Sequence, residues 1–341
     1  VRNLLSAVLV VSGLAWGDQH LCAQGDGATG TDPACAGTLA VDGRPQVTIV
    51  LAQDAIASER TAAEELAGYL GKITGGTFAV VEESGDVAGP CLYVGPTAFA
   101  RASGLDPGTW GPERWALRTV GADLVLVGGR PRGTLYAVYH FLEDALGVRW
   151  WNALEEYVPH QPTLRLAALD RQGEPRFRYR DIYLLYAHDG GRFGVRNRLN
   201  GQGFGPTDPA LGGGVYYGPP NGVHTFYIYL PPAEYFDKHP DWYSLIDGHR
   251  TADQAQLCLT NRELRAAVID KLKAHIEQAR RDAEQAGRLP PLDFDISQND
   301  WHGMCQCAAC QAIARREGSE SGPLIDFLNE VADAVRDTYP E

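Results

Sequence analysis

Positive charge is scarce in this chain of 341 residues. Lysine and arginine number 30 against 43 aspartates and glutamates, and the formal net charge is −13 at pH 7. The sequence also has no long basic run. Because proteins bind nucleic acids through positively charged surfaces, we expect no nucleic-acid partner. A hydrophobic content of 44% is typical of a globular protein and excludes a wholly disordered one.

Long apolar runs are also lacking, apart from one near the N-terminus. Residues 4–14 (LLSAVLVVSGL) follow Arg2 and precede the small-residue pattern Ala15–Gly17, which is typical of a signal peptide. The run is too short to cross about 30 Å of hydrocarbon. We therefore predict a signal peptide at 1–17, an unstructured lead-in at 18–44, no membrane span, and a secreted or periplasmic protein.

Two common catalytic motifs are missing. Residues 128–133 (GGRPRG) precede an expected helix, but they lack the Lys-Ser/Thr pair of a phosphate-binding loop and contain Pro131. The sequence also has no Gly-x-Ser-x-Gly nucleophile elbow. Neither a P-loop nucleotide site nor an α/β-hydrolase triad is expected.

Residues 45–152 show the pattern of a compact α+β domain. Apolar residues recur at spacings of three and four between Ala62 and Ile73, and Gly75-Gly76 follows, which predicts a helix that ends there. Short β-branched and aromatic runs bounded by Gly, Pro or Asp predict strands on either side. The expected strands lie at 47–51, 78–81, 92–94, 115–120 and 124–127, and the expected helices at 58–70 and 133–146.

Residues 175–341 show a different pattern, in which short strands alternate with long amphipathic helices at 261–286 and 322–339. This alternation predicts the start of a (β/α)₈ barrel. The expected strands lie at 179–185, 225–230, 242–245, 256–259 and 293–297. Since only about four β/α units are found where a barrel has eight, we expect the barrel to be truncated and the chain to be a piece of a longer protein.

Two parts of the chain resemble known families. Residues 128–143 (GGRPRGTLYAVYHFLE) and 146–151 (LGVRWW) resemble the end of the N-terminal domain of bacterial α-glucuronidases, a domain type that also precedes the barrel of β-N-acetylhexosaminidases. The region from Arg178 resembles a secreted bacterial family known as domain of unknown function 4838. The matching stretches of that region are 235–245, 256–261, 297–300, 305–310 and 327–332.

The resemblance covers about residues 45–341 and carries the functional expectation. It implies an α-glucuronidase/hexosaminidase-like domain at 45–152 and the first half of a glycoside hydrolase-like barrel at 175–341. The implied function is that of a secreted carbohydrate-active protein, a glycosidase acting on a polysaccharide or glycan. The alternative is a non-catalytic glycan-binding or cell-surface protein of the same architecture. The 4838 family itself brings no settled activity.

Candidate site residues gather after the strand expected at 293–297. Polar residues at the carboxyl end of a strand are how α/β barrels build active sites. Asp300 is the candidate catalytic acid, with Trp301 beside it to desolvate the carboxyl group. The resemblance implies that Trp301 stacks on a sugar and that Asn299 and His224 bind its hydroxyl groups. The alternative for His224 is a structural role, which is the more frequent one for a lone histidine. Asp300 could instead order the following loop, and the second carboxylate that glycosidases normally use is not identified.

Cysteines follow this site at the spacing C-x-C-x₂-C. Cys305, Cys307 and Cys310 can share one structural zinc ion, with His302 or Cys258 as the fourth ligand. The alternative, which an exported protein favours, is one disulfide and one free thiol. No cofactor is expected to be required apart from this candidate zinc.

Overall fold

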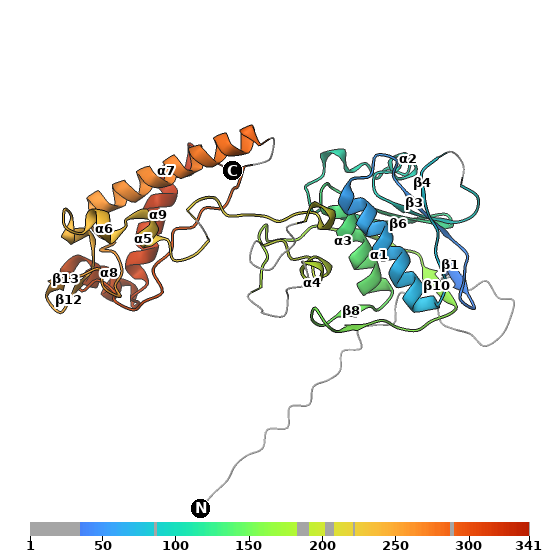
Figure 1. Cartoon of the computed structure of the whole chain (residues 1–341), viewed down its shortest axis with the longest axis horizontal. Coiled ribbons are helices and arrows are strands. Elements are labelled where there is room, and N and C mark those ends of the chain that lie inside the picture. Colours follow the sequence, from blue (N-terminus) through green and yellow to red (C-terminus); the bar gives the residue numbers. More distant parts are fainter. Residues whose placement is uncertain are drawn as a thin grey trace, which may run out of the picture. The chain divides into compact units, whose positions relative to one another are not determined.

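The computed structural model describes residues 35–84, 87–182, 191–201, 208–220, 222–286 and 290–340. They fall into two compact units, which divide between Val215 and Tyr216 (Figure 1). The predicted signal peptide, and the lead-in as far as residue 34, lie outside the described residues. No helix in the described part of the chain is long and apolar enough to span a membrane.

The first unit is built on a six-stranded sheet. The strand order is β11-β6-β7-β5-β3-β4; β7, β5, β3 and β4 run parallel, while β6 and β11 are antiparallel to their neighbours. The strands are β3 Thr48–Leu51, β4 Val80–Glu82, β5 Cys91–Val94, β6 Trp115–Val120, β7 Asp123–Gly128 and β11 Asp170–Gly173. The strands predicted at 47–51, 92–94, 115–120 and 124–127 are therefore confirmed.

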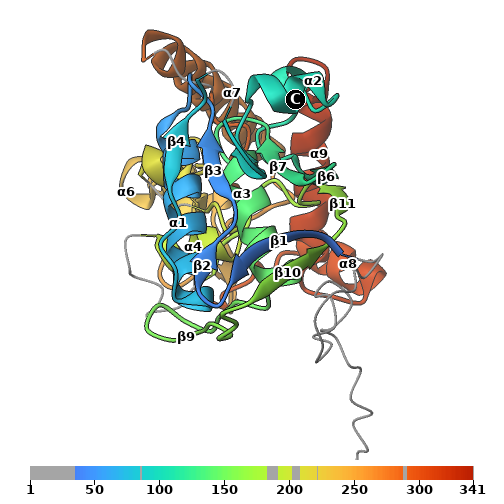
Figure 2. The ribbon, with the colours of Figure 1, turned by 90° about the vertical axis from the view of Figure 1, so that its right-hand side faces the viewer.

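Both faces of this sheet are covered. Helices α1, Ala57–Thr74, and α3, Gly133–His140, pack on one face, and α3 continues as the π-helix η2, Phe141–Ala145 (Figure 2). On β7, Leu124 and Leu126 join the core beneath these helices. Val125 and Val127 point to the other face, where they pack with residues of α2, Ala98–Ala102. The alternation follows from the two-residue period of a strand.

Smaller elements complete the first unit. A second sheet, in the order β10-β1-β2, includes part of the segment predicted to be unstructured, because residues 35–41 pair with a strand more than a hundred residues away and residues 44–45 pair with residues 40–41. A local pattern does not reveal such a partner. These elements are β1 Cys35–Val41, β2 Arg44–Pro45, β10 Leu164–Ala167, β8 Arg149–Trp150, β9 Glu156–Tyr157, η1 Pro107–Thr109, α4 Arg192–Arg196 and η4 Pro209–Leu211.

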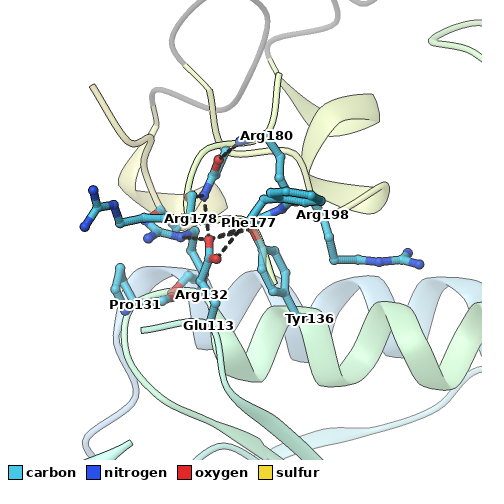
Figure 3. Close-up of polar contacts among 11 residues, drawn as sticks. Glu113, Pro131, Arg132, Tyr136, Phe177, Arg178, Arg180 and Arg198 are labelled. Atoms are coloured by element: carbon cyan, nitrogen blue, oxygen red, sulfur yellow. Dashed lines mark hydrogen bonds and ion pairs between the residues drawn. The ribbon is translucent and has the colours of Figure 1, made fainter. Parts of the chain in front are cut away.

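A buried carboxylate attaches the segment around Arg180 to the first unit (Figure 3). Glu113 accepts hydrogen bonds from Arg132 Nε at 2.8 Å, from both terminal nitrogens of Arg180 at 2.9 Å, and from Asn200 Nδ2 at 2.8 Å. Tyr136 adds its hydroxyl at 3.2 Å. The network joins Arg180 and Asn200 to Glu113 within the first compact unit, which extends to Val215.

The second unit consists mainly of helices. Its long helices are α7, Arg262–Gln285, and α9, Gly322–Arg336, and the Asn261 side chain caps α7 by accepting from Leu264 N at 3.0 Å. Apolar side chains of both helices pack around Phe226, Tyr229 and Tyr243. The remaining elements are α5 Phe226–Tyr229, α6 Pro232–Tyr235, η5 Pro240–Trp242, β12 Leu245–Ile246, β13 His249–Arg250 and α8 Ala308–Glu317.

The mixed α/β class is correct, but the predicted barrel is not seen. Within the described part of residues 216–340, β12 and β13 form the only strand ladder. The segment predicted as a strand at 225–230 contains helix α5. The segments at 256–259 and 293–297 make only isolated bridges, Tyr243–Leu257 and Tyr217–Asp293. Strand propensity is largely a measure of fit to a pleated surface, so a β-like run needs a partner to become a strand.

Candidate functional site

The predicted site residues lie on two segments of the second unit that contact each other. Phe226 N donates to Ser297 O at 3.1 Å, and the His224 ring nitrogen Nδ1 lies 3.1 Å from Gln298 O. Thr225 Oγ1 donates to the Asp295 carboxylate at 3.0 Å. The structure therefore brings His224 beside the segment that carries Asn299, Asp300 and Trp301, although more than seventy residues separate them in sequence.

Three of these residues are open to solvent. His224 and Asp300 are exposed, and Trp301 retains 45% of its accessible surface. The Trp301 ring is tilted against Tyr227, with the ring centroids 5.9 Å apart. His224 has a φ of 55°, a left-handed conformation that is uncommon outside glycine and is often associated with functional sites. This face, defined by His224, Asp300 and Trp301, is called the exposed face below.

Asn299 lies at the same place but is buried, with 4% of its surface exposed. Its Nδ2 donates to Ala255 O at 2.9 Å, and its Oδ1 accepts from Tyr227 N at 3.4 Å. The amide is thus used inside the protein, where it joins the two segments. The structure favours a positioning role for Asn299 over the predicted contact with a sugar hydroxyl.

A residue that the sequence analysis did not single out fixes the backbone of this loop. Gln256 is 1% exposed, and its Nε2 donates to the carbonyl oxygens of Asn299 and Trp301 at 2.9 and 2.5 Å. Its Oε1 accepts from Asn299 N at 2.9 Å. One amide therefore holds the loop on either side of Asp300. No sequence signal distinguishes such a glutamine, because its partners are backbone atoms over forty residues away.

Four cysteines meet next to this loop. The Sγ atoms of Cys258, Cys305, Cys307 and Cys310 all lie within 4.8 Å of one another. Cys307 caps α8, accepting from Cys310 N at 3.5 Å, while Cys258 precedes α7. This set is called the four-thiol cluster. His302 lies outside it; His302 is exposed and lines a neighbouring cavity of about 270 Å³ with Cys305 and Cys310.

The cluster has the dimensions of a tetrahedral metal site. Zinc–sulfur bonds of about 2.3 Å place the sulfurs of such a site roughly 3.8 Å apart, and the Cys258 and Cys307 Sγ atoms are 3.7 Å apart. A disulfide would bring two sulfurs to about 2.05 Å, whereas all four cysteines here are free thiols. The four-thiol cluster could therefore bind a metal ion.

Polar donors surround the sulfurs. Leu245 N donates to Cys305 Sγ at 3.4 Å, the Thr260 hydroxyl lies 3.2 Å from Cys310 Sγ, and Arg250 Nη1 lies 3.9 Å from Cys305 Sγ. Hydrogen bonds with Cys305 and Cys310 lower the pKa of the Cys258 thiol, and the hydrogen bond with Cys258 raises the pKa of Cys305 to about 11. Burial opposes the charge of Arg250, but its hydrogen bond to Cys258 raises the pKa of the guanidinium. The hydrogen bond with Cys258 also raises the pKa of Cys310, so these contacts favour a thiolate at Cys258 and neutral thiols at Cys305 and Cys310.

Comparison with known families identifies the chain. The model of the family described as "Domain of unknown function (DUF4838)" matches residues 150–341, which is more than half of the chain. The protein belongs to this family. The membership predicted from the sequence is confirmed, and no curated protein matches the chain.

Solved structures with similarity to this DUF4838 protein include glycoside hydrolases. A Streptomyces plicatus N-acetyl-β-hexosaminidase is 20% identical over 50% of this chain and 32% of its own, with a TM-score of 0.32. A family GH115 4-O-methyl-α-glucuronidase is 13% identical over 87% and 40%, with a TM-score of 0.41. A Bacteroides fragilis β-N-acetylhexosaminidase is 11% identical over 90% and 64%, with a TM-score of 0.35. The chain spans about a third of the first of these enzymes, and similarity at this level does not extend to activity or substrate.

Proposed function

We propose that this DUF4838 protein is a secreted carbohydrate-active protein that binds a glycan at the exposed face. The observation that carries the proposal is a half-exposed indole, Trp301, that follows the exposed Asp300 on a loop whose Gln298 carbonyl lies 3.1 Å from the exposed His224 ring. An aromatic ring offers an apolar surface to the C–H face of a sugar, and carboxylate and imidazole groups bind hydroxyls. A net charge of −13 disfavours polyanionic partners.

Whether the protein also cleaves the glycan depends on Asp300. In the glycosidase hypothesis, Asp300 is the acid that protonates the leaving oxygen. The nearby carboxylate of Asp295 is a poor candidate for the second catalytic group. It already accepts hydrogen bonds from Thr225 at 3.0 Å and Ser297 at 2.6 Å, which gives it a structural role. A non-catalytic glycan-binding protein is therefore the second candidate.

The test compares two exposed tryptophans in glycan binding and turnover. We expect Trp301→Ala to weaken binding in a glycan array and by calorimetry at least about tenfold, as loss of an aromatic anchor does. Trp151→Ala, which removes an indole that is 64% exposed in the first unit, serves as the matched control and should bind normally. Equal binding by both variants would refute the exposed face as the site. Glycan hydrolysis that Asp300→Asn abolishes would establish the glycosidase; binding without hydrolysis in the unaltered protein would establish the binding protein.

We further propose that the four-thiol cluster binds one zinc ion with a structural role. Four thiolates fill the tetrahedral positions, which leaves no open site for substrate. Zinc would supply a crosslink between the segment at Cys258 and residues 305–310, which lead into the first turn of α8. Leu245 N, Thr260 and Arg250 would then contact the thiolates from outside.

Metal content tests this assignment and the identity of the fourth ligand. We expect one zinc per chain by elemental analysis, and four additional thiols titrating after denaturation with a chelator. Cys258→Ser should lose the metal, whereas His302→Ala should keep it. Retention of zinc by Cys258→Ser together with its loss from His302→Ala would make His302 the fourth ligand. A metal-free protein with an oxidised cysteine pair would reject the zinc site.

A further inference from the structure

The exposed face and the four-thiol cluster share the same two backbone segments. Ala255 and Gly303 form a parallel bridge, and Gln256 N donates to Gly303 O at 2.9 Å. Just beyond this bridge, each segment contributes a thiol, Cys258 on one and Cys305 on the other. The pairing therefore lies between the loop that carries Trp301 on one side and the sulfurs on the other.

The two segments approach as closely as backbone atoms allow. A Cβ atom on Gly303 would lie 2.5 Å from Gln254 O and 2.6 Å from Ala255 Cα, distances that real side chains do not reach. Because the two segments are packed this closely, a shift of one segment at the sulfurs is expected to displace Gly303. From Gly303 the chain leads directly back to Trp301.

The loop at residues 299–301 is held through hydrogen bonds to its backbone and not through the exposed side chains of Asp300 and Trp301. Asp300 and Trp301 are exposed, while the Gln256 amide bonds the carbonyls of Asn299 and Trp301 and the N–H of Asn299. Gln256 lies two residues before Cys258, on the segment that metal binding would fix. The orientation of the exposed side chains thus depends on where this segment lies.

Taken together, these contacts lead us to propose that the metal-loaded cluster and Gln256 act as one clamp that positions the glycan-binding loop. Metal bound by Cys258 and Cys305 closes the far end of the two segments, and the Gln256 amide transmits that closure to residues 299–301. Gln256 is a positioning residue in this scheme, and metal loading regulates the exposed face. The inference rests on the proposed zinc and glycan sites, but it can be measured without a glycan.

Hydrogen–deuterium exchange of the full chain tests the clamp. With zinc removed by a chelator, we expect amides in a 297–304 peptide to exchange at least tenfold faster, while peptides of α7 and of the β6–β7 hairpin change little. Restoring Zn²⁺ alone should restore protection. Unchanged exchange in 297–304 after metal loss would overturn the clamp while leaving the zinc site intact, and a protein that never contains zinc would instead remove the proposal on which the clamp rests. Equal loss of protection across α7 would show a global fold requirement and would also overturn it.

Two variants of Gln256 separate positioning from folding. Gln256→Ala removes the donors and the acceptor, so exchange in 297–304 should rise while zinc content and α7 protection stay normal. Gln256→Glu keeps an acceptor for Asn299 N but loses the Nε2 donors, and it should give an intermediate rate. If Gln256→Ala leaves 297–304 as protected as in the unaltered protein, Gln256 does not position the loop.

Discussion

The two units of this protein hold their chains together by different means. In the first, the hydrogen bonds of a six-stranded sheet join segments that are distant in sequence, and both faces of its central strand β7 are buried. In the second, the segments around Gln256 and Asn299 meet only at isolated bridges within the described residues. Side-chain amides and thiols take over the role that ladder hydrogen bonds play in the first unit. Where two segments are not joined by a strand ladder, a few side chains hold them together.

Buried charge shows the same contrast. The Glu113 side chain in the first unit is 8% exposed, and the Arg132 and Arg180 partners are 9% and 16% exposed. In the second unit, Arg265 is 9% exposed, but its partners Asp326 and Glu330 are 34% and 51% exposed. Water can replace those carboxylates at Arg265, whereas it has little access to the guanidinium groups around Glu113. The charge network of the first unit is therefore the more sensitive to mutation.

The largest expected effect comes from Glu113→Gln. Removing the carboxylate leaves two buried guanidinium groups without a counter-charge, which costs about 3–5 kcal/mol when a buried pair is broken. We expect chemical denaturation, followed by exchange of α3 peptides, to show this loss in the first unit and no change in α7. Glu82→Gln is the matched control, because its ion pair with Arg60 is exposed and contributes at most about 1 kcal/mol. A Glu113→Gln protein as stable as this control would contradict the comparison.

The same carboxylate contributes to the acid stability of the first unit. Burial by itself would raise the pKa of Glu113, but hydrogen bonds from Arg180 and the charge of Arg132 lower it below its usual value. Because the folded-state pKa lies below the unfolded one, near 4.3, the carboxylate stabilises the fold fully above that pH. This contribution is lost as the pH falls through the folded-state pKa. Glu113→Gln should flatten the decline in stability below about pH 5, measured as the denaturation midpoint against pH.

Sequence patterns predicted the first unit better than the second, for a physical reason. Helix α1 and strand β6 follow from local periodicity and from Gly75, whose φ of 80° ends the helix. The run at 225–230 is equally β-like but forms α5, because no partner strand lies beside it among the described residues. Local sequence patterns therefore predict a strand correctly where a regular sheet provides a neighbouring strand for it to pair with.

The candidate site divides along the same line. Spacing alone indicated Cys305, Cys307 and Cys310 as metal ligands, since they lie within six consecutive residues. Cys258 joins them from 47 residues upstream of Cys305, so it could be offered only as one of two alternatives for the fourth position. The burial of the Asn299 amide and the hydrogen bonds from Gln256 to the loop depend on tertiary structure, and no local sequence pattern indicates them. Site residues that lie close together in one segment can be predicted from the sequence. Contacts between two distant segments cannot be predicted in this way.

A smaller effect is expected in the second unit, at His275 on α7. Burial, together with the charge of Lys271, lowers the pKa of the imidazole below 6.5, and the ring packs edge-on against Tyr229 at 5.5 Å. Since the folded-state pKa is the lower one, stability is fully present above pH 6.5 and declines as the pH falls through the folded-state value. We expect α7 in zinc-saturated protein to have lower protection factors, after correction for the intrinsic pH dependence of amide exchange, at pH 5.5 than at 7.5, and His275→Gln to reduce that difference. His249→Gln, which alters an exposed histidine of β13, is the control. An α7 response that persists in His275→Gln, with zinc still bound at both pH values, would assign the acid sensitivity of this unit to a group other than His275.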